Sequence, residues 1–299
     1  MDSAAAPPSV VDAHVHVWDL ARRPQPWIDP RSMAVLERDY QPAELGAEVL
    51  SAGVSSAVLV QVLNDPEESE DLLWIGAERP FSAVVPWLDL LGHDLEPRLE
   101  AMLSHPSGAH LAGVRHQALA EADPAGWLAR VGEGPGFALL GARSLAFDLL
   151  LGPDHLATAH AVVAAHPSTT FVVDHAGKPP VTSGWSSAES RRWAECIARI
   201  SQLPNAFCKM SGLTTLADLT TWNRSELEPY VDHLLSRFGA ERLMFGSDWP
   251  VSLRAGSYSR TVETARELVG TLTPSEQESV LAGTACRVYG LPGPGGPRS

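Results

Sequence analysis

The sequence predicts an α/β fold and, within that class, a single-domain (β/α)8 barrel, also called a TIM barrel. Three observations predict it. Short apolar runs rich in Val, Leu and Phe recur at intervals of roughly 25 to 40 residues, the size of one strand with its helix. Amphipathic segments lie between these runs. Polar side chains follow the runs, and a barrel gathers the carboxyl ends of its strands at one mouth.

The eight expected strands are almost continuously apolar, which is typical of parallel strands buried on both faces. The main alternative fold is a doubly wound open sheet. No Gly-x-Gly-x-x-Gly pattern follows the first strand, and this weakens the alternative. The expected strands span residues 10–17, 56–62, 81–88, 111–115, 144–149, 170–174, 206–211 and 242–247.

The expected helices end close to glycine or proline, residues that stop helices. Thr273 can cap the last helix, with Pro274 at its first position. Asp154 is expected to cap the helix that begins at residue 156. The sequence predicts helices over residues 42–52, 156–165, 186–203, 225–238, 261–270 and 274–281.

We expect the barrel to occupy residues 10–290, after a short N-terminal extension at residues 1–9. Residues 291–299 are rich in proline and glycine and are expected to form a flexible tail. The segment 22–39 has no regular period and contains several prolines. We expect it to lie over the barrel mouth as a loop that carries Trp27.

The composition argues against several classes of protein. A net charge of −14 without a Lys/Arg cluster argues against a nucleic-acid surface. The first residues lack the features of a signal peptide, and no apolar run reaches the roughly 18 residues of a membrane helix. The three cysteines form no Cys-x-x-Cys pair and are expected to be reduced thiols. We therefore expect a cytoplasmic protein with a small-molecule partner, either alone or as a homo-oligomer.

The first expected strand holds the first candidate site. Because alternate residues of a strand share a face, His14 and His16 point the same way. Asp248 occupies the corresponding place after the last strand, and a closed barrel brings the first and last strands together. Neutral imidazoles and a carboxylate suit Zn²⁺ or Mn²⁺. The alternative is a hydrogen-bonded network without an ion or substrate.

Further polar and aromatic side chains end the other strands. His175 could be another ligand or an electrophile, or a structural histidine. Arg115 and His116 could bind a carbonyl or carboxylate oxygen, or Arg115 could pair with a nearby aspartate. Lys209 could hold a substrate oxygen or form a structural ion pair. The other candidate substrate contacts are Gln61 and three tryptophans for which core packing is the alternative, namely Trp18, Trp87 and Trp249.

Five motifs stand in order along the chain. They are VDAHVHVW at 11–18, GVRH at 113–116, VDHAGKP at 173–179, KMSGL at 209–213 and FGSDWP at 245–250. Together they resemble the amidohydrolase-related branch of the amidohydrolase superfamily, and within it the group of sugar lactonases and dicarboxylate lactonases. The resemblance runs from about residue 10 to residue 289.

The resemblance implies a (β/α)8 barrel that opens lactone rings. By position, His14 and His16 match the family's first-strand pair, and His175 matches its later histidine. Asp248 matches the last-strand aspartate that activates water. No lysine ends the fourth strand, where binuclear relatives carry one. The implied cofactor is therefore a single divalent metal, zinc before manganese, or none.

The expected substrate is a sugar aldonolactone of the fucono-, rhamnono- or galactono- type. A dicarboxylate lactonase, acting on a pyrone or muconolactone, is one alternative, with Arg22, Arg23 and Arg254 as further basic candidates. A metal-dependent decarboxylase of the same family is another. A ligand-binding barrel without activity is the third.

Overall fold

The computed structural model describes residues 9–292, so most of the predicted N-terminal extension and of the C-terminal tail lies outside the described residues. All eight predicted strands are present, each overlapping its predicted run. They are β1 (Val11–Val15), β2 (Ser56–Val60), β3 (Phe81–Val85), β4 (Gly113–His116), β5 (Ala146–Leu149), β6 (Phe171–Val173), β7 (Ala206–Met210) and β8 (Leu243–Phe245).

The strands close into a barrel. Parallel ladders join β1 to β3 in order and β4 to β8 in order. The Ala112 amide donates to the Val84 carbonyl at 3.0 Å and connects the β3 and β4 edges. At the other junction, the amide of His16 donates to the Trp249 carbonyl at 2.7 Å, and that of Asp248 donates to the His14 carbonyl at 2.9 Å. The predicted (β/α)8 barrel is confirmed, and its first and last strands are neighbours.

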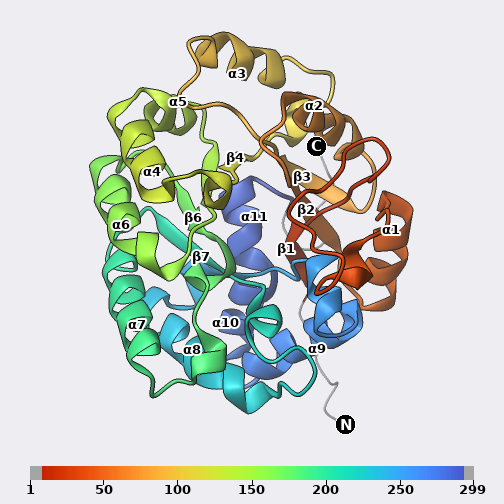
Figure 1. Cartoon of the computed structure of the whole chain (residues 1–299), viewed down its shortest axis with the longest axis vertical. Coiled ribbons are helices and arrows are strands. Elements are labelled where there is room, and N and C mark those ends of the chain that lie inside the picture. Colours follow the sequence, from red (N-terminus) through yellow and green to blue (C-terminus); the bar gives the residue numbers. More distant parts are fainter. Residues whose placement is uncertain (1–8, 293–299) are drawn as a thin grey trace.

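Helices surround the strands on the outside of the barrel (Figure 1). Six match the predicted helices within a few residues: α1 (Pro42–Ser51), α6 (Leu156–Ala165), α7 (Ala188–Ile200), α8 (Arg224–Phe238), α9 (Tyr258–Leu268) and α10 (Pro274–Glu278). The sequence analysis did not name five others: α2 (Pro66–Ile75), α3 (Leu95–Leu103), α4 (Pro124–Glu133), α5 (Gly136–Ala142) and α11 (Thr284–Tyr289).

The helix caps test the predicted signals. Thr273 caps α10 as predicted, because its hydroxyl accepts from the Glu276 amide. The prediction for Asp154 is wrong. This residue lies inside the 3-10 turn Pro153–His155, and α6 begins after His155 without a side-chain cap.

The amino ends of the strands form an apolar floor that α11 covers. Val11, Ala13 and Val58 pack there with Ala285 of α11, in a cluster of buried residues. Leu291, which the sequence assigned to the flexible tail, is buried in the same cluster, and its amide donates to the Cys286 carbonyl at 2.9 Å. The ordered chain therefore continues beyond residue 290.

Residues 22–39 form the predicted loop at the mouth. Trp27 lies on the wall of the cavity at the carboxyl ends of the strands. Arg22 and Arg23 both pair with Asp71 of α2, which anchors the start of the loop. Among the described residues, no helix is long and apolar enough to cross a membrane.

Candidate active site

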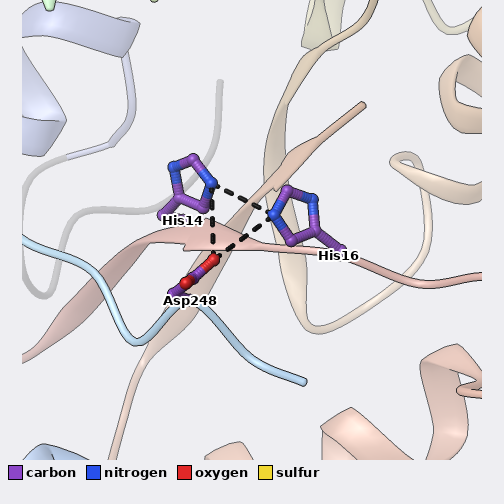
Figure 2. Close-up of side chains that lie close together, drawn as sticks. All are labelled: His14, His16 and Asp248. Carbon is purple, nitrogen blue, oxygen red and sulfur yellow. Dashed lines mark hydrogen bonds and ion pairs between the residues drawn. The ribbon is translucent and has the colours of Figure 1, made fainter. Parts of the chain in front are cut away.

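The structure brings His14, His16 and Asp248 together at the mouth, and all three side chains are buried (Figure 2). The two imidazole Nε2 atoms lie 3.1 Å apart. The Asp248 Oδ1 atom lies 3.5 Å from His16 Nε2 and 3.9 Å from His14 Nε2. These contacts join residues from the two ends of the chain, as the closed barrel requires.

Asp12 fixes this junction, although the sequence analysis gave it no role. Its Oδ1 atom accepts from the Ser247 amide at 2.7 Å and from the His14 amide at 3.1 Å. The Tyr258 hydroxyl donates to Oδ2 at 3.0 Å. Burial raises the pKa of Asp12 to about 6, although these hydrogen bonds oppose the rise. Asp12 thus ties β1 to the segment that carries Asp248.

His175 joins the same cluster. Its ring centroid lies 4.6 Å from that of His14, and its Nε2 atom lies 3.9 Å from Asp248 Oδ1. The Ser211 hydroxyl lies 2.9 Å from its Nδ1 atom and holds the ring in place. Three imidazoles therefore surround one carboxylate.

The electrostatics keep the carboxylate charged and two of the rings neutral. Burial lowers the pKa of His175 to about 4, and burial together with the nearby Lys209 ammonium lowers that of His14 well below its ordinary value. Burial alone would raise the pKa of Asp248, but His175 and His16 hold it below its ordinary value. At neutral pH the cluster offers an ionised base beside neutral donors and acceptors.

A buried ion-pair network lies beneath His14. The Lys209 ammonium is fully buried and lies 2.5 Å from Asp148 Oδ2, 3.1 Å from Asp174 Oδ1 and 3.0 Å from His14 Nδ1. The Tyr289 hydroxyl of α11 donates to Asp148 Oδ1 at 2.8 Å. Lys209 therefore forms the structural ion pair, one of its two predicted roles. Because the ammonium is fully buried in this pair and does not line the cavity, it does not contact a bound substrate.

Arg115 spans the network and the cavity. Its guanidinium donates to Asp174 Oδ2 at 3.1 Å and lies 3.2 Å from His14 Nε2. It also donates to the backbone carbonyl and the side-chain oxygen of Gln61. Gln61 is fully buried and orients Arg115. Arg115 therefore carries a fixed positive charge at the base of the cavity.

The cavity above the cluster has a volume of about 450 Å³, which falls within the range of small-molecule sites. Of the seven predicted substrate contacts, only Arg115 lines it. Its other polar lining residues are His16, Asn64, Gln117, His175, Lys178, Thr215, Asp248 and Arg254; its apolar lining includes Trp27, Met33, Leu63, Leu119, Leu150, Leu216 and Val251.

His116 and Trp87 do not line the cavity, so neither is placed to contact a substrate directly. The Trp87 indole donates to His116 Nδ1 at 2.9 Å, and Glu121 lies 2.8 Å from His116 Nε2. The ring of Trp127 stacks on His116 with the centroids 3.8 Å apart. All sides of this imidazole are occupied by protein.

Trp18 and Trp249 pack into the protein core, which was the alternative to substrate contact for both residues. The Trp18 indole donates to the Arg38 carbonyl at 2.8 Å. Trp249 is fully buried, and its ring meets that of Tyr40 edge to face at 5.2 Å. Both support the mouth loop and do not line the cavity. Arg22 and Arg23, paired with Asp71, lie away from the cavity as well.

The sequence analysis gave no role to Lys178 or Asn64, although both line the cavity. Lys178 stood in the motif after the sixth strand, which was the only signal for it. Arg254 was named as a basic candidate, and the structure places it on the cavity wall.

The donor set at the site fits one divalent metal. The Val60 carbonyl only accepts, so His16 donates to it from Nδ1 at 2.8 Å and directs the Nε2 lone pair into the site. Asp174 Oδ1, 3.4 Å from His14 Nδ1, can accept the proton of that atom when His14 Nε2 binds a metal, although the Lys209 ammonium lies closer to Nδ1, at 3.0 Å. His14, His16 and Asp248 present one ligand atom each at mutually close range, and His14, Asp174 and His175 form a second such group.

Comparison with known proteins places the chain in a family. Residues 11–291 match the Amidohydrolase family model. The chain is 34% identical over 294 residues to an L-fucono-1,5-lactonase from Burkholderia multivorans, covering 95% of this chain and 97% of that protein. Two crystal structures of an amidohydrolase from the same species cover 95% of this chain and 100% of theirs. The one with bound HEPES has a TM-score of 0.88 at 32% identity, and the one with bound zinc has 0.86 at 33%. The chain belongs to the amidohydrolase family.

Proposed function

We propose that the protein is a carboxylic-ester hydrolase that opens the lactone ring of a sugar acid. One observation carries the proposal: an ionised carboxylate, Asp248, lies among three imidazoles at the base of a cavity of about 450 Å³. This arrangement can deprotonate a water molecule beside a bound ester carbonyl. The similarity to L-fucono-1,5-lactonases supports the same reaction class.

Lactone opening needs a nucleophilic water and a stabilised oxyanion. Asp248 takes a proton from water, and the resulting hydroxide adds to the lactone carbonyl carbon. The guanidinium of Arg115, 3.2 Å from His14 Nε2, places positive charge where the carbonyl oxygen becomes negative. Donors of this kind typically contribute about 3 to 4 kcal/mol each to transition-state stabilisation. Collapse of the tetrahedral intermediate breaks the bond to the ring oxygen and leaves a hydroxy acid.

His14, His16, His175 and Asp248 are the residues we propose to hold one divalent metal, Zn²⁺ before Mn²⁺. A bound metal would supply Lewis-acid polarisation of the carbonyl and lower the pKa of water. Arg115 and Lys178 also bring positive charge to the cavity wall, and lactone opening without a metal is the alternative that the chelator test distinguishes.

The cavity wall supports a sugar lactone as the substrate class. Trp27, Leu150 and Val251 provide apolar surface, while Asn64, Gln117 and Thr215 provide hydrogen-bonding groups. Such a mixed wall suits a ring with an apolar face and several hydroxyls. We propose an aldonolactone of the fucono-, rhamnono- or galactono- type, processed in carbohydrate metabolism.

A lactone panel tests the function. We expect purified protein to open L-fucono-1,5-lactone or a related aldonolactone, releasing one acid proton per turnover in a pH-stat. The same panel after dialysis against a chelator, and after addition of Zn²⁺ or Mn²⁺, measures the metal requirement. Release of carbon dioxide from an aromatic acid, with no lactone opened, would identify a decarboxylase instead. Turnover restricted to pyrone or muconolactone dicarboxylates would identify a dicarboxylate lactonase instead of a sugar lactonase.

A further inference from the structure

The segment after β6 has an unusual backbone. His175, Ala176, Gly177 and Lys178 follow one another in the left-handed region, with φ values of 51°, 54°, 67° and 55°. Residues other than glycine rarely adopt this conformation, and a run of them is costly. Such strain persists where the surrounding structure enforces it, and it concentrates at functional sites.

The surrounding fold enforces this turn. The Trp193 indole of α7 donates to the Ala176 carbonyl at 2.8 Å, and the Lys178 amide donates to the His175 carbonyl at 2.8 Å. A Cβ atom on Gly177 would lie 3.0 Å from Leu156 and 3.2 Å from Ile197, so the backbone packs directly against α6 and α7. Contacts with both α6 and α7 therefore hold the turn in this conformation.

The turn presents two side chains to the same place. Residues three apart in one helical turn lie on the same side, and His175 and Lys178 both line the cavity. Asp248 lines it as well. The strained backbone therefore brings an amine to the cavity that holds the candidate base.

Lys178 differs from Arg115 and Lys209 in having no fixed partner, and Arg254 on the same wall shares this property within residues 9–292. Arg115 pairs with Asp174, and Lys209 pairs with Asp148. Within residues 9–292, no hydrogen bond or ion pair holds the Lys178 ammonium, and only longer-range interactions with Asp248, Arg115 and Asp174 act on it. Burial lowers the pKa of Lys178, and the Asp248 carboxylate opposes that change. A partly buried ammonium without a partner on a cavity wall is costly unless a ligand binds it.

We propose that Lys178 is a second catalytic residue, which binds the ring oxygen of the lactone and protonates it as the ring opens. The inference rests on the proposed function. Arg115 and Arg254 also line the cavity, but a guanidinium does not release its proton. His175 is one of the residues proposed to hold the metal, and the Ser211 hydroxyl, 2.9 Å from its Nδ1 atom, already engages its other ring nitrogen. Among the described cavity residues, Lys178 is the cation that can act as an acid.

The proton balance closes without a further reactant. Water gives one proton to Asp248, and its oxygen bonds to the carbonyl carbon. The bond from that carbon to the ring oxygen breaks, the electron pair goes to the ring oxygen, and the Lys178 proton follows it. The neutral amine then recovers the proton held by Asp248, since an amine is the stronger base. The product acid ionises into solvent.

A change of leaving atom tests the role. A thiolate leaves without a proton, so the 1,5-thiolactone analogue of L-fucono-1,5-lactone should not need Lys178. We expect Lys178→Met to lower kcat/KM for the lactone about 100-fold or more, and for the thiolactone less than about fivefold. Lys178→Arg keeps the charge but cannot donate its proton, so it should show the same selective loss. Arg254→Met, which removes another charge from the wall, should change both substrates by the same factor.

The outcomes separate the two proposals. Equal losses on both substrates in Lys178→Met, or full lactone activity in Lys178→Arg, would overturn the acid role. A wild-type protein that opens no lactone would instead overturn the proposed function. If wild type refuses the thiolactone, the pH profile decides: the fall of kcat/KM at alkaline pH should disappear in Lys178→Arg and persist in Arg254→Met. Thermal unfolding of each variant verifies that it is folded.

Discussion

The two ends of the barrel are built on opposite principles. At the floor, apolar residues such as Val11 and Val58 form one buried cluster with residues of α11, and the Tyr289 hydroxyl reaches from α11 to Asp148. At the mouth, polar groups are buried and the backbone is strained. Of the five non-glycine residues with positive φ in the described chain, Ser144 alone lies outside the mouth; the others are His175, Ala176, Lys178 and Asp248. Each such residue costs about 1 to 2 kcal/mol.

The difference shows how stability and chemistry are divided in this fold. Close apolar packing at the floor raises the free energy of unfolding, whereas the buried charges and strained backbone at the mouth lower it. The buried pairs of Lys209 with Asp148 and Asp174 connect the two ends. Substitutions in this network and at the two ends of the barrel therefore test how stability and chemistry are divided.

Lys209→Met should have the largest effect on stability. It leaves Asp148 and Asp174 buried without their main counter-charge, and breaking a buried ion pair from one side costs about 3 to 5 kcal/mol. Urea denaturation would measure the loss of unfolding free energy. The matched control is Arg224→Met, since Arg224 forms an exposed pair with Glu228 and should lose less than about 1 kcal/mol. A loss below about 1 kcal/mol for Lys209→Met would mean that the network does not hold the ends together.

Glu68→Gln should change how stability depends on pH. Glu68 is buried in α2, where its Oε2 atom accepts from the amides of Val62 and Leu63 at 3.0 and 2.8 Å. Burial raises the pKa of Glu68 to about 7, against the effect of these amides. The folded state therefore holds the proton more tightly than the unfolded state. The resulting stability is fully present below the ordinary pKa near 4.5 and is lost as pH rises through 7.

The variant should unfold like wild type at pH 4.5 and be the more stable protein at pH 8, by on the order of 2 to 3 kcal/mol. Urea denaturation at both pH values measures this. A constant difference between the two proteins across this range would show that burial at the mouth does not penalise the charged form.

Tyr289→Phe should have the smallest effect. It removes one hydrogen bond to buried Asp148, which typically costs about 1 to 2 kcal/mol. Asp148 keeps its pairing with Lys209, so His14 keeps its support and kcat should stay within about threefold of wild type. Denaturation and lactone turnover measured on one preparation would show both. A tenfold fall in kcat without a loss of stability would mean that the floor helix tunes the site directly.

The sequence predicted the strands and the central cluster because both follow from regular patterns. Apolar runs mark buried strands. Closure of the barrel makes the first and last strands neighbours, and this brings His14 beside Asp248. The substrate contacts were harder to predict. Whether His116 faces a cavity or Trp127 depends on side-chain packing that no periodicity encodes. The left-handed turn at Lys178 is held by packing against α6 and α7 on either side of it in the sequence, and no periodicity encodes this packing.

The turnover of Asp248→Asn shows whether the carboxylate held between β1 and β8 activates water. Asparagine keeps the shape of the side chain but cannot act as a base. We expect the variant to fold with an unchanged unfolding midpoint and to open the best aldonolactone about 10³-fold more slowly than wild type. A folded variant that turns over within threefold of wild type would contradict this expectation.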